Sequence, residues 1–255
     1  MKFALKAVLS VVLILAIGGG GWWVWKADRD GVFEILLSRE AKAVPDAERY
    51  EVLVSELERW RGDLKAAHAK ARTAQEKAAV ENDARVILEL VLPEMMQCWV
   101  GTPYDFNGTA EKPGGGKVAC GYYVSTVIRD AGFRVNRYKL AQQPSENIMR
   151  TFLDGEGCKL KVGEDYDRYV DWVEGQEPGV YLIGMDTHVG FIVNRADGMH
   201  FFHSSGWKQR GVVGEPGKKA GALRSSNWRM LGGLTMDQGV IQTWLKGEKV
   251  KVRVQ

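Results

Sequence analysis

The pattern of apolar and polar residues divides this 255-residue chain into three stretches. Residues 7–17 are strongly apolar, and no charged residue occurs between Lys6 and Lys26. Residues 46–92 carry apolar side chains at helical spacing, beginning with Tyr50, Leu53 and Leu57. After Cys98, glycines and aromatic residues become frequent and short apolar runs replace the helical periodicity. We therefore expect an N-terminal apolar segment, a helical segment and a compact domain.

The first stretch, residues 1–26, predicts either a cleaved signal peptide or an uncleaved transmembrane anchor. Lys2 and Lys6 precede the apolar run, as in a signal peptide. The charge-free span is also long enough to suggest an anchor, with Trp22 and Trp23 suited to a membrane interface. Both interpretations place the rest of the chain outside the cytoplasm. It is expected to be membrane-anchored and facing the periplasm or extracellular side, or secreted.

Residues 27–85 are expected to form a helical spacer or accessory segment, and residues 86–255 the catalytic domain. Between residues 46 and 92 the chain has one glycine and no proline, which favours one or two helices. Much of this segment is charged and rich in alanine, which is typical of a solvated helical face.

The third stretch predicts one amphipathic helix followed by several strands. In "ACGYYVSTVIRDAGF", Val124, Val127, Ile128 and Ala131 recur at helical spacing. "GVYLIGM", "HVGFIVN" and "MHFFHSS" are short apolar runs typical of strands, and "RADG" predicts a hairpin turn between the last two. "GALRSSNWRMLGGL" contains a further strand, and "KVKVRV" alternates as a strand does. A helix followed by a run of strands indicates an α+β fold.

Composition and charge exclude little but point away from nucleic acid as a partner. The chain is 45% hydrophobic and 26% charged, with a net charge of +3, so it lacks the concentrated basic surface typical of nucleic-acid binders. The three cysteines are Cys98, Cys120 and Cys158. Pairing of Cys98 with Cys158 would leave Cys120 free, but the sequence does not decide this. Their spacing does not resemble a zinc site, so we expect no metal and no cofactor.

Cys120 is the candidate nucleophile because it stands at the start of the predicted helix. The positive end of a helix lowers a thiol pKa, and its free N–H groups can bind a developing oxyanion. His188 begins a strand, with Gly190 on the same face, and is the candidate base. His203, near the end of the next strand, would orient it. His200 is the rival for this role, and because residues three apart on a regular strand face opposite sides, only one of the two can face the site.

Four motifs carry a resemblance to a known family: "WVGTPYDFNG", "ACGYYVSTVIRDAGF", "THVGFIV" and "MHFFHSS". Together they resemble the NlpC/P60 superfamily of papain-like cysteine peptidases over about residues 99–205. The resemblance implies a nucleophile helix packed on an antiparallel sheet, and hydrolysis of amide bonds in peptidoglycan stem peptides. It implies Cys120 as nucleophile, His188 as base and His203 as the third catalytic residue, with Tyr104 shaping the substrate pocket.

The chain departs from the family pattern beside the nucleophile. Ala119 replaces the usual aspartate, and Gly121–Tyr122 replaces the usual serine and glycine. Two alternatives to a wall peptidase therefore stay open. The first is a cysteine acyl-amide hydrolase or acyltransferase acting on other substrates. The second is a degenerate, non-catalytic domain that binds cell-wall peptides. The expected partners are peptidoglycan stem peptides and, through residues 1–26, the membrane; the oligomeric state is left open.

Overall fold

The computed structural model describes residues 43–153, 155–207 and 210–254. From Val44 onwards the chain forms one compact unit. The expected signal peptide or anchor, residues 1–26, lies outside the described residues. Within the described ranges, no helix has the length and apolar character needed to cross a membrane.

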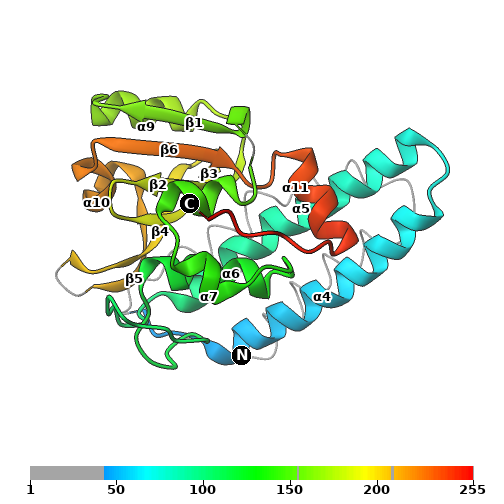
Figure 1. The fold of residues 1–255 in the computed structure, drawn as a ribbon, viewed down its shortest axis with the longest axis horizontal. Helices are drawn as coiled ribbons and strands as arrows, with labels where there is room; N and C mark the ends of the chain where they lie inside the picture. Colours follow the sequence, from blue (N-terminus) through cyan, green and yellow to red (C-terminus); the bar gives the residue numbers. More distant parts are fainter. Residues whose placement is uncertain (1–42, 154, 208–209, 255) are drawn as a thin grey trace. The chain divides into compact units, whose positions relative to one another are not determined.

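Two long helices, α4 (Ala47–Lys70) and α5 (Ala74–Trp99), form an antiparallel hairpin at the start of this unit (Figure 1). The chain leaves the first helix at Ala71, and Thr73 begins the second with a capping box, in which its side chain and that of Glu76 satisfy each other's backbone N–H groups. The apolar stripe of α4 contributes Tyr50 and Leu57 to the core. The helical periodicity over residues 46–92 is thus confirmed as two helices.

A six-stranded sheet lies against this hairpin, and all of its pairings are antiparallel. The strand order is β1-β6-β2-β3-β4-β5. The strands are β1 (Cys158–Val162), β2 (Gly179–Met185), β3 (Val189–Arg195), β4 (Gly198–Ser205), β5 (Gly211–Pro216) and β6 (Trp228–Gly233). Arg195 pairs with Gly198, which confirms a tight hairpin at the "RADG" turn. The α+β class is therefore confirmed.

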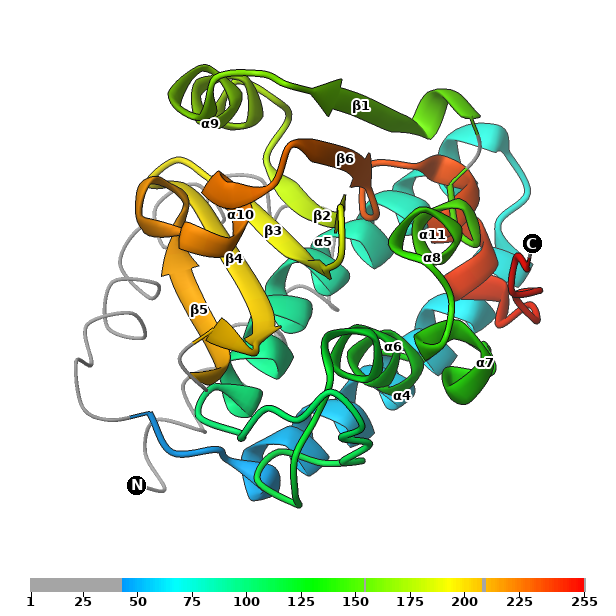
Figure 2. The same ribbon diagram turned by 60° about the vertical axis from the view of Figure 1, so that its left-hand side comes forward.

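Helices cover both faces of the sheet (Figure 2). On one face lie α5 and α6 (Cys120–Asp130), and a core cluster joins them to Leu182, Phe191 and Phe202 of the strands. On the other face α9 (Tyr166–Glu174) and α10 (Gly221–Ser225) pack over Ile192 and Phe201. The remaining helices are α7 (Arg137–Ala141), α8 (Ser145–Arg150), α11 (Gln238–Lys246) and the short 3-10 turns η1 (Gly155–Gly157) and η3 (Gly217–Lys219).

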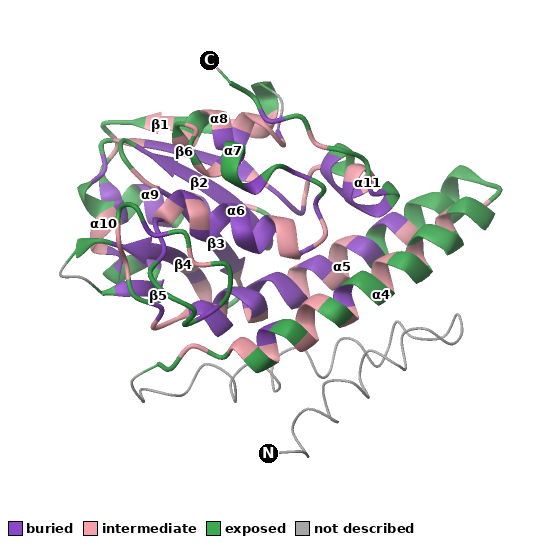
Figure 3. Cartoon of the chain, turned by 60° about the horizontal axis from the view of Figure 1, so that its bottom comes forward, coloured by how far each residue is buried: buried purple, intermediate pink, exposed green. Residues whose placement is uncertain are grey.

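The expected boundary between a spacer ending at residue 85 and a domain starting at residue 86 falls inside α5, which is one continuous helix. Both helices of the hairpin belong to the same compact unit as the sheet. Figure 3 shows α5 largely buried where it faces the sheet, while the outer surface of α4 is exposed. The charged, alanine-rich sequence does not reveal that these helices pack into the core, because only one narrow face of each helix is apolar.

Pro144 is the capping residue of α8, and the Ser145 hydroxyl donates to the Met185 carbonyl over 2.9 Å, which ties this helix to the end of β2. The alternating tail "KVKVRV" forms only an isolated bridge between Lys249 and Arg134 rather than a strand. Alternation alone does not create a strand, because strand formation depends on pairing with a neighbouring strand.

Candidate active site

Cys120 is the first residue of α6, as the sequence predicts. Ala119 occupies the capping position in an extended conformation, and its methyl group satisfies none of the helix's first N–H groups. These groups stay available beside the thiol because an α-helix leaves its first four N–H groups without internal partners. Ala119 thus leaves the start of α6 without a side-chain cap.

The segment leading to Cys120 is held from two sides. The N–H of Val118 donates to Pro103 over 2.9 Å, and the N–H of Ala119 donates to Gly108 over 2.9 Å. From the sheet, the buried hydroxyl of Ser204 donates to the Val118 carbonyl over 2.6 Å. Ser204 comes from the "HSS" motif, so this motif ties the nucleophile segment to β4.

The residue after the nucleophile has to be a glycine for steric reasons. A Cβ atom at Gly121 would lie 2.4 Å from the carbonyl oxygen of Ala141, at the end of α7. No real side chain tolerates this distance to a backbone atom. The Gly121–Tyr122 departure from the family pattern therefore accompanies a close approach of α7 to the start of α6.

His188 and His203 are brought together by the β3–β4 hairpin. Nε2 of His188 lies 2.7 Å from Nδ1 of His203, with the two rings perpendicular. Phe201 stacks on the His203 ring at a centroid distance of 4.1 Å. A Cβ at Gly190 would lie 2.7 Å from the Phe201 ring, which confirms that this glycine leaves room on the face it shares with His188.

The rival histidine lies elsewhere. His200 lines a separate pocket with Asp197 and Lys218, beside the β3–β4 turn. The parity argument from the sequence therefore matches the geometry, in which His203 and not His200 contacts His188.

Behind His203 lies a charged pair that the sequence analysis missed. Nε2 of His203 is 3.2 Å from Oε1 of Glu215, whose other oxygen lies 2.9 Å from Nη1 of Arg210. The side chains of His203 and Glu215 are 1% and 8% exposed. One feature of the sequence could have indicated Glu215: it is a glutamate within the strand-like run "GVVGEP", which follows the strands that carry the histidines.

Burial controls the ionisation of Cys120 and His188, the candidate nucleophile and base. It raises the pKa of the Cys120 thiol, while the N–H groups of Val189, Gly121 and Cys120 itself act in the opposite direction. Burial, together with the charge of His203, lowers the pKa of His188 to about 3. The expected lowering of the Cys120 pKa by the helix end is thus overridden by desolvation, so both the Cys120 thiol and the His188 imidazole are neutral at rest.

A pocket of about 450 Å³ contains both candidate catalytic groups. Cys120 and His188 line it together with Gln143, Ser145, Thr187 and Trp228. The charged side chains in its lining are both acidic, Glu146 and Asp186. Cys120 and His188 thus border one pocket, whose charged side chains suit a neutral or cationic ligand.

Tyr104 lies on another side of the nucleophile. It is absent from the lining of this pocket, but its ring lies against Gly206, where a Cβ would come within 2.8 Å of it. Burial raises the pKa of Tyr104, and the charges of Cys120 and Asp105 act in the same direction. The tyrosine is thus near the thiol, without lining the pocket that Cys120 shares with His188.

All three cysteines are free, so the Cys98–Cys158 pairing that the sequence left open is not formed. Cys98 is buried in α5, and burial raises its pKa to about 12. Cys158 begins β1. Among the described residues, no group of three or more histidine, cysteine or acidic side chains is arranged to hold a metal ion.

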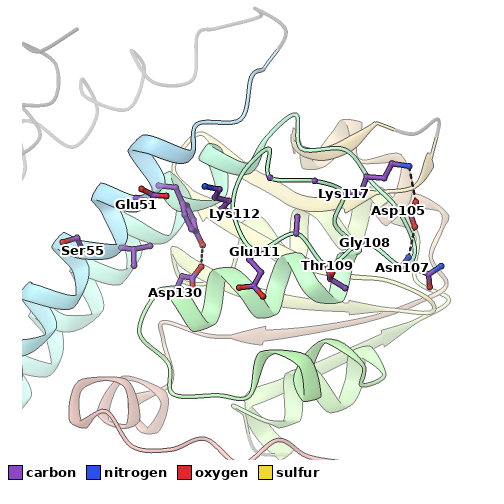
Figure 4. A pocket seen from close by; sticks show the side chains of 15 residues that line it. Glu51, Ser55, Asp105, Asn107, Gly108, Thr109, Glu111, Lys112, Lys117 and Asp130 are labelled. Atoms are coloured by element: carbon purple, nitrogen blue, oxygen red, sulfur yellow. Dashed lines mark hydrogen bonds and ion pairs between the residues drawn. The ribbon is translucent and has the colours of Figure 1, made fainter.

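A larger cavity, of about 1060 Å³, lies between α4 and the loop that precedes Cys120 (Figure 4). Its lining includes Glu51, Glu111, Lys112 and Asp130, and Tyr50 donates a hydrogen bond of 3.0 Å to Asp130 at its edge. None of the residues singled out from the sequence for catalysis lines this cavity. This cavity and the candidate catalytic residues therefore lie in different parts of the described unit.

Comparison of the chain with protein-family models, with curated proteins and with solved structures finds no match.

Proposed function

We propose that this protein is a cysteine amidohydrolase that cleaves amide bonds of peptidoglycan stem peptides outside the cytoplasm. The observation that carries the proposal is the shared pocket of Cys120 and His188, with the His188 ring fixed through Nε2 by His203. The motifs that resemble the NlpC/P60 superfamily supply the substrate class. Residues 1–26 supply the expectation that the enzyme is exported and either anchored or released.

The first chemical step follows from which nitrogen of His188 is left free. Since Nε2 is engaged by His203, Nδ1 is the nitrogen available to take the proton from the Cys120 thiol. The thiolate then attacks the substrate carbonyl carbon, and the carbonyl electron pair moves to oxygen. The uncapped N–H groups at the start of α6 stabilise this oxyanion.

The second half of the reaction returns the proton and releases the products. The protonated His188 donates its proton to the nitrogen of the leaving amine as the C–N bond breaks. Water, deprotonated by His188, then attacks the thioester, which frees the carboxylate product and restores the thiol. In this scheme His188 starts neutral, in agreement with its lowered pKa.

Digestion of purified peptidoglycan by the full-length protein tests the proposal. Mass spectrometry is expected to find new amine and carboxyl ends in stem peptides with the wild type, and none with Cys120→Ala or His188→Ala. Cys158→Ala is the matched control, because it removes a partly buried thiol outside the pocket. Muropeptides that stay intact after digestion with the wild type as well as with the variants would overturn the proposal. Release of acyl chains from lipid substrates instead would favour the acyl-amide hydrolase or acyltransferase alternative.

A further inference from the structure

The imidazole of His203 is held between two partners, and only one of them is a candidate catalytic group. Its Nδ1 faces His188 at 2.7 Å and its Nε2 faces Glu215 at 3.2 Å. Arg210 holds the second oxygen of Glu215 at 2.9 Å. Since His203 and Glu215 are almost fully buried, water does not replace either contact.

The protonation state of Glu215 determines which atom donates in each hydrogen bond from Glu215 through His203 to His188. Burial acts to raise the pKa of Glu215, but hydrogen bonds from His203 and Arg210 bring it below its ordinary value, so the group is a carboxylate. A carboxylate only accepts, so Nε2 of His203 carries a hydrogen and donates it. In neutral His203, Nδ1 is then an acceptor, and it receives the hydrogen on Nε2 of His188. Nδ1 of His188 is left with a lone pair, as a base for the Cys120 thiol requires.

We propose that Glu215, oriented by Arg210, is a positioning residue that fixes the tautomers of His203 and His188 and stabilises the imidazolium formed when His188 takes the thiol proton. This inference rests on the proposed function, in which Cys120 and His188 form the reacting pair. Glu215 lies on β5, so the proposal adds a residue of this strand to the site formed by Cys120, His188 and His203.

Besides orienting the two imidazole rings, the negative charge of Glu215 stabilises the His188 imidazolium. When the proton passes from Cys120 to His188, a positive charge appears two hydrogen bonds away from the Glu215 carboxylate. A negative charge at that distance inside a protein favours the protonated imidazole. The other titratable or charged groups around these hydrogen-bonded residues are Glu146 and Asp186 in the pocket, Tyr104 near the thiol, Arg210, and Tyr166, whose pKa Glu215 helps to raise.

The test is the rate of Cys120 alkylation by iodoacetamide as a function of pH, followed by mass spectrometry of the peptide that contains Cys120. Glu215→Gln keeps the shape of the side chain but removes its charge. We expect alkylation to be at least tenfold slower than in the wild type near pH 7, where reaction depends on the thiolate–imidazolium pair. The two rates should converge near pH 10, where the thiol ionises without help.

Glu94→Gln is the matched control. Glu94 is also a mostly buried carboxylate paired with an arginine, Arg49, but it lies on α5 and outside the pocket. Its rate profile should coincide with that of the wild type. Equal rates for Glu215→Gln and the wild type at pH 7 would overturn the proposal, as would an equal slowing in Glu94→Gln.

A second measurement in the wild type covers the case in which Glu215→Gln does not fold. Long-range 1H–15N NMR of the imidazoles, assigned with His203→Gln, reports which nitrogen of each ring is protonated. Both His203 and His188 are expected to be Nε2–H tautomers. An Nδ1–H tautomer of His203 would overturn the proposal.

These readouts need no wall substrate, so the two proposals fail in different ways. If Glu215→Gln slows alkylation but no stem peptide is cleaved, the positioning role stands and the proposed substrate is wrong. If stem peptides are cleaved but Glu215→Gln behaves as the wild type, the proposed function stands and Glu215 has no positioning role.

Discussion

Nε2 of His188 lies 2.7 Å from Nδ1 of His203, although fifteen positions separate the two residues in the chain. The β3–β4 hairpin creates this contact by placing Phe191 opposite Phe202, so that the start of one strand meets the end of the next. The contact orients His188 toward the pocket that it shares with Cys120. The first prediction follows from it.

Replacing His203 by alanine should lower kcat for stem-peptide hydrolysis by about 100-fold or more, with little change in KM, because loss of an orienting group leaves the base in the wrong tautomer or position. Steady-state kinetics on a defined stem peptide measure the effect. His200→Ala, on the same strand but lining another pocket, should stay within about twofold of the wild type. A larger loss in His200→Ala than in His203→Ala would reverse the assignment.

Replacing Gly121 by alanine should destabilise the fold by about 2 kcal/mol, because the new Cβ would overlap the Ala141 carbonyl. Urea unfolding measures the change in the free energy of unfolding. Gly62→Ala is the matched control, since it lies inside α4 with nothing within 4 Å of the added methyl group. That variant should gain about 0.5–1 kcal/mol, the usual benefit of alanine over glycine in a helix. Similar effects at both glycines would rule out a special close approach at Gly121.

Replacing Ser204 by alanine should cost about 1–2 kcal/mol, because it removes the buried hydrogen bond to the Val118 carbonyl. The same variant should slow alkylation of Cys120, since Val118 lies two residues before the nucleophile. Ser225→Ala removes a comparable hydroxyl bond on the surface, to Ala222, and should change neither quantity. Unchanged stability and reactivity in Ser204→Ala would show that the sheet does not hold the nucleophile segment.

Stability should fall as the pH is lowered from about 6.5 toward 3. Because burial and the His203 charge lower the pKa of folded His188 to about 3, the unfolded chain binds this proton first. The loss should be about 1 kcal/mol per pH unit, somewhat below the full 1.4 for one proton because the ordinary histidine pKa of about 6.5 lies inside the measured range. Urea unfolding between pH 7 and pH 5 measures the slope, which should be shallower in His188→Gln. An unchanged slope in that variant would contradict a buried, neutral His188.

The sequence by itself determined the elements that carry the candidate catalytic residues. The spacing of Val124, Val127 and Ile128 gave the helix that begins at Cys120, and the apolar runs around "RADG" gave the hairpin that carries His188 and His203. These features are local, because periodicity and turn chemistry act over a few residues. Parity along β4 indicated that only one of His200 and His203 could face the site, and the resemblance of "MHFFHSS" to the family motif favoured His203.

Only the tertiary structure decided how these elements combine. It docked the charged hairpin of α4 and α5 into the same core as the sheet, and it left Cys98 and Cys158 unpaired. It placed Glu215 and Arg210 behind His203, and it partly buried Cys120, so that desolvation raises the thiol pKa against the effect of the helix end. The physical reason is that burial and long-range hydrogen bonds depend on which surfaces meet, and no short stretch of sequence records that.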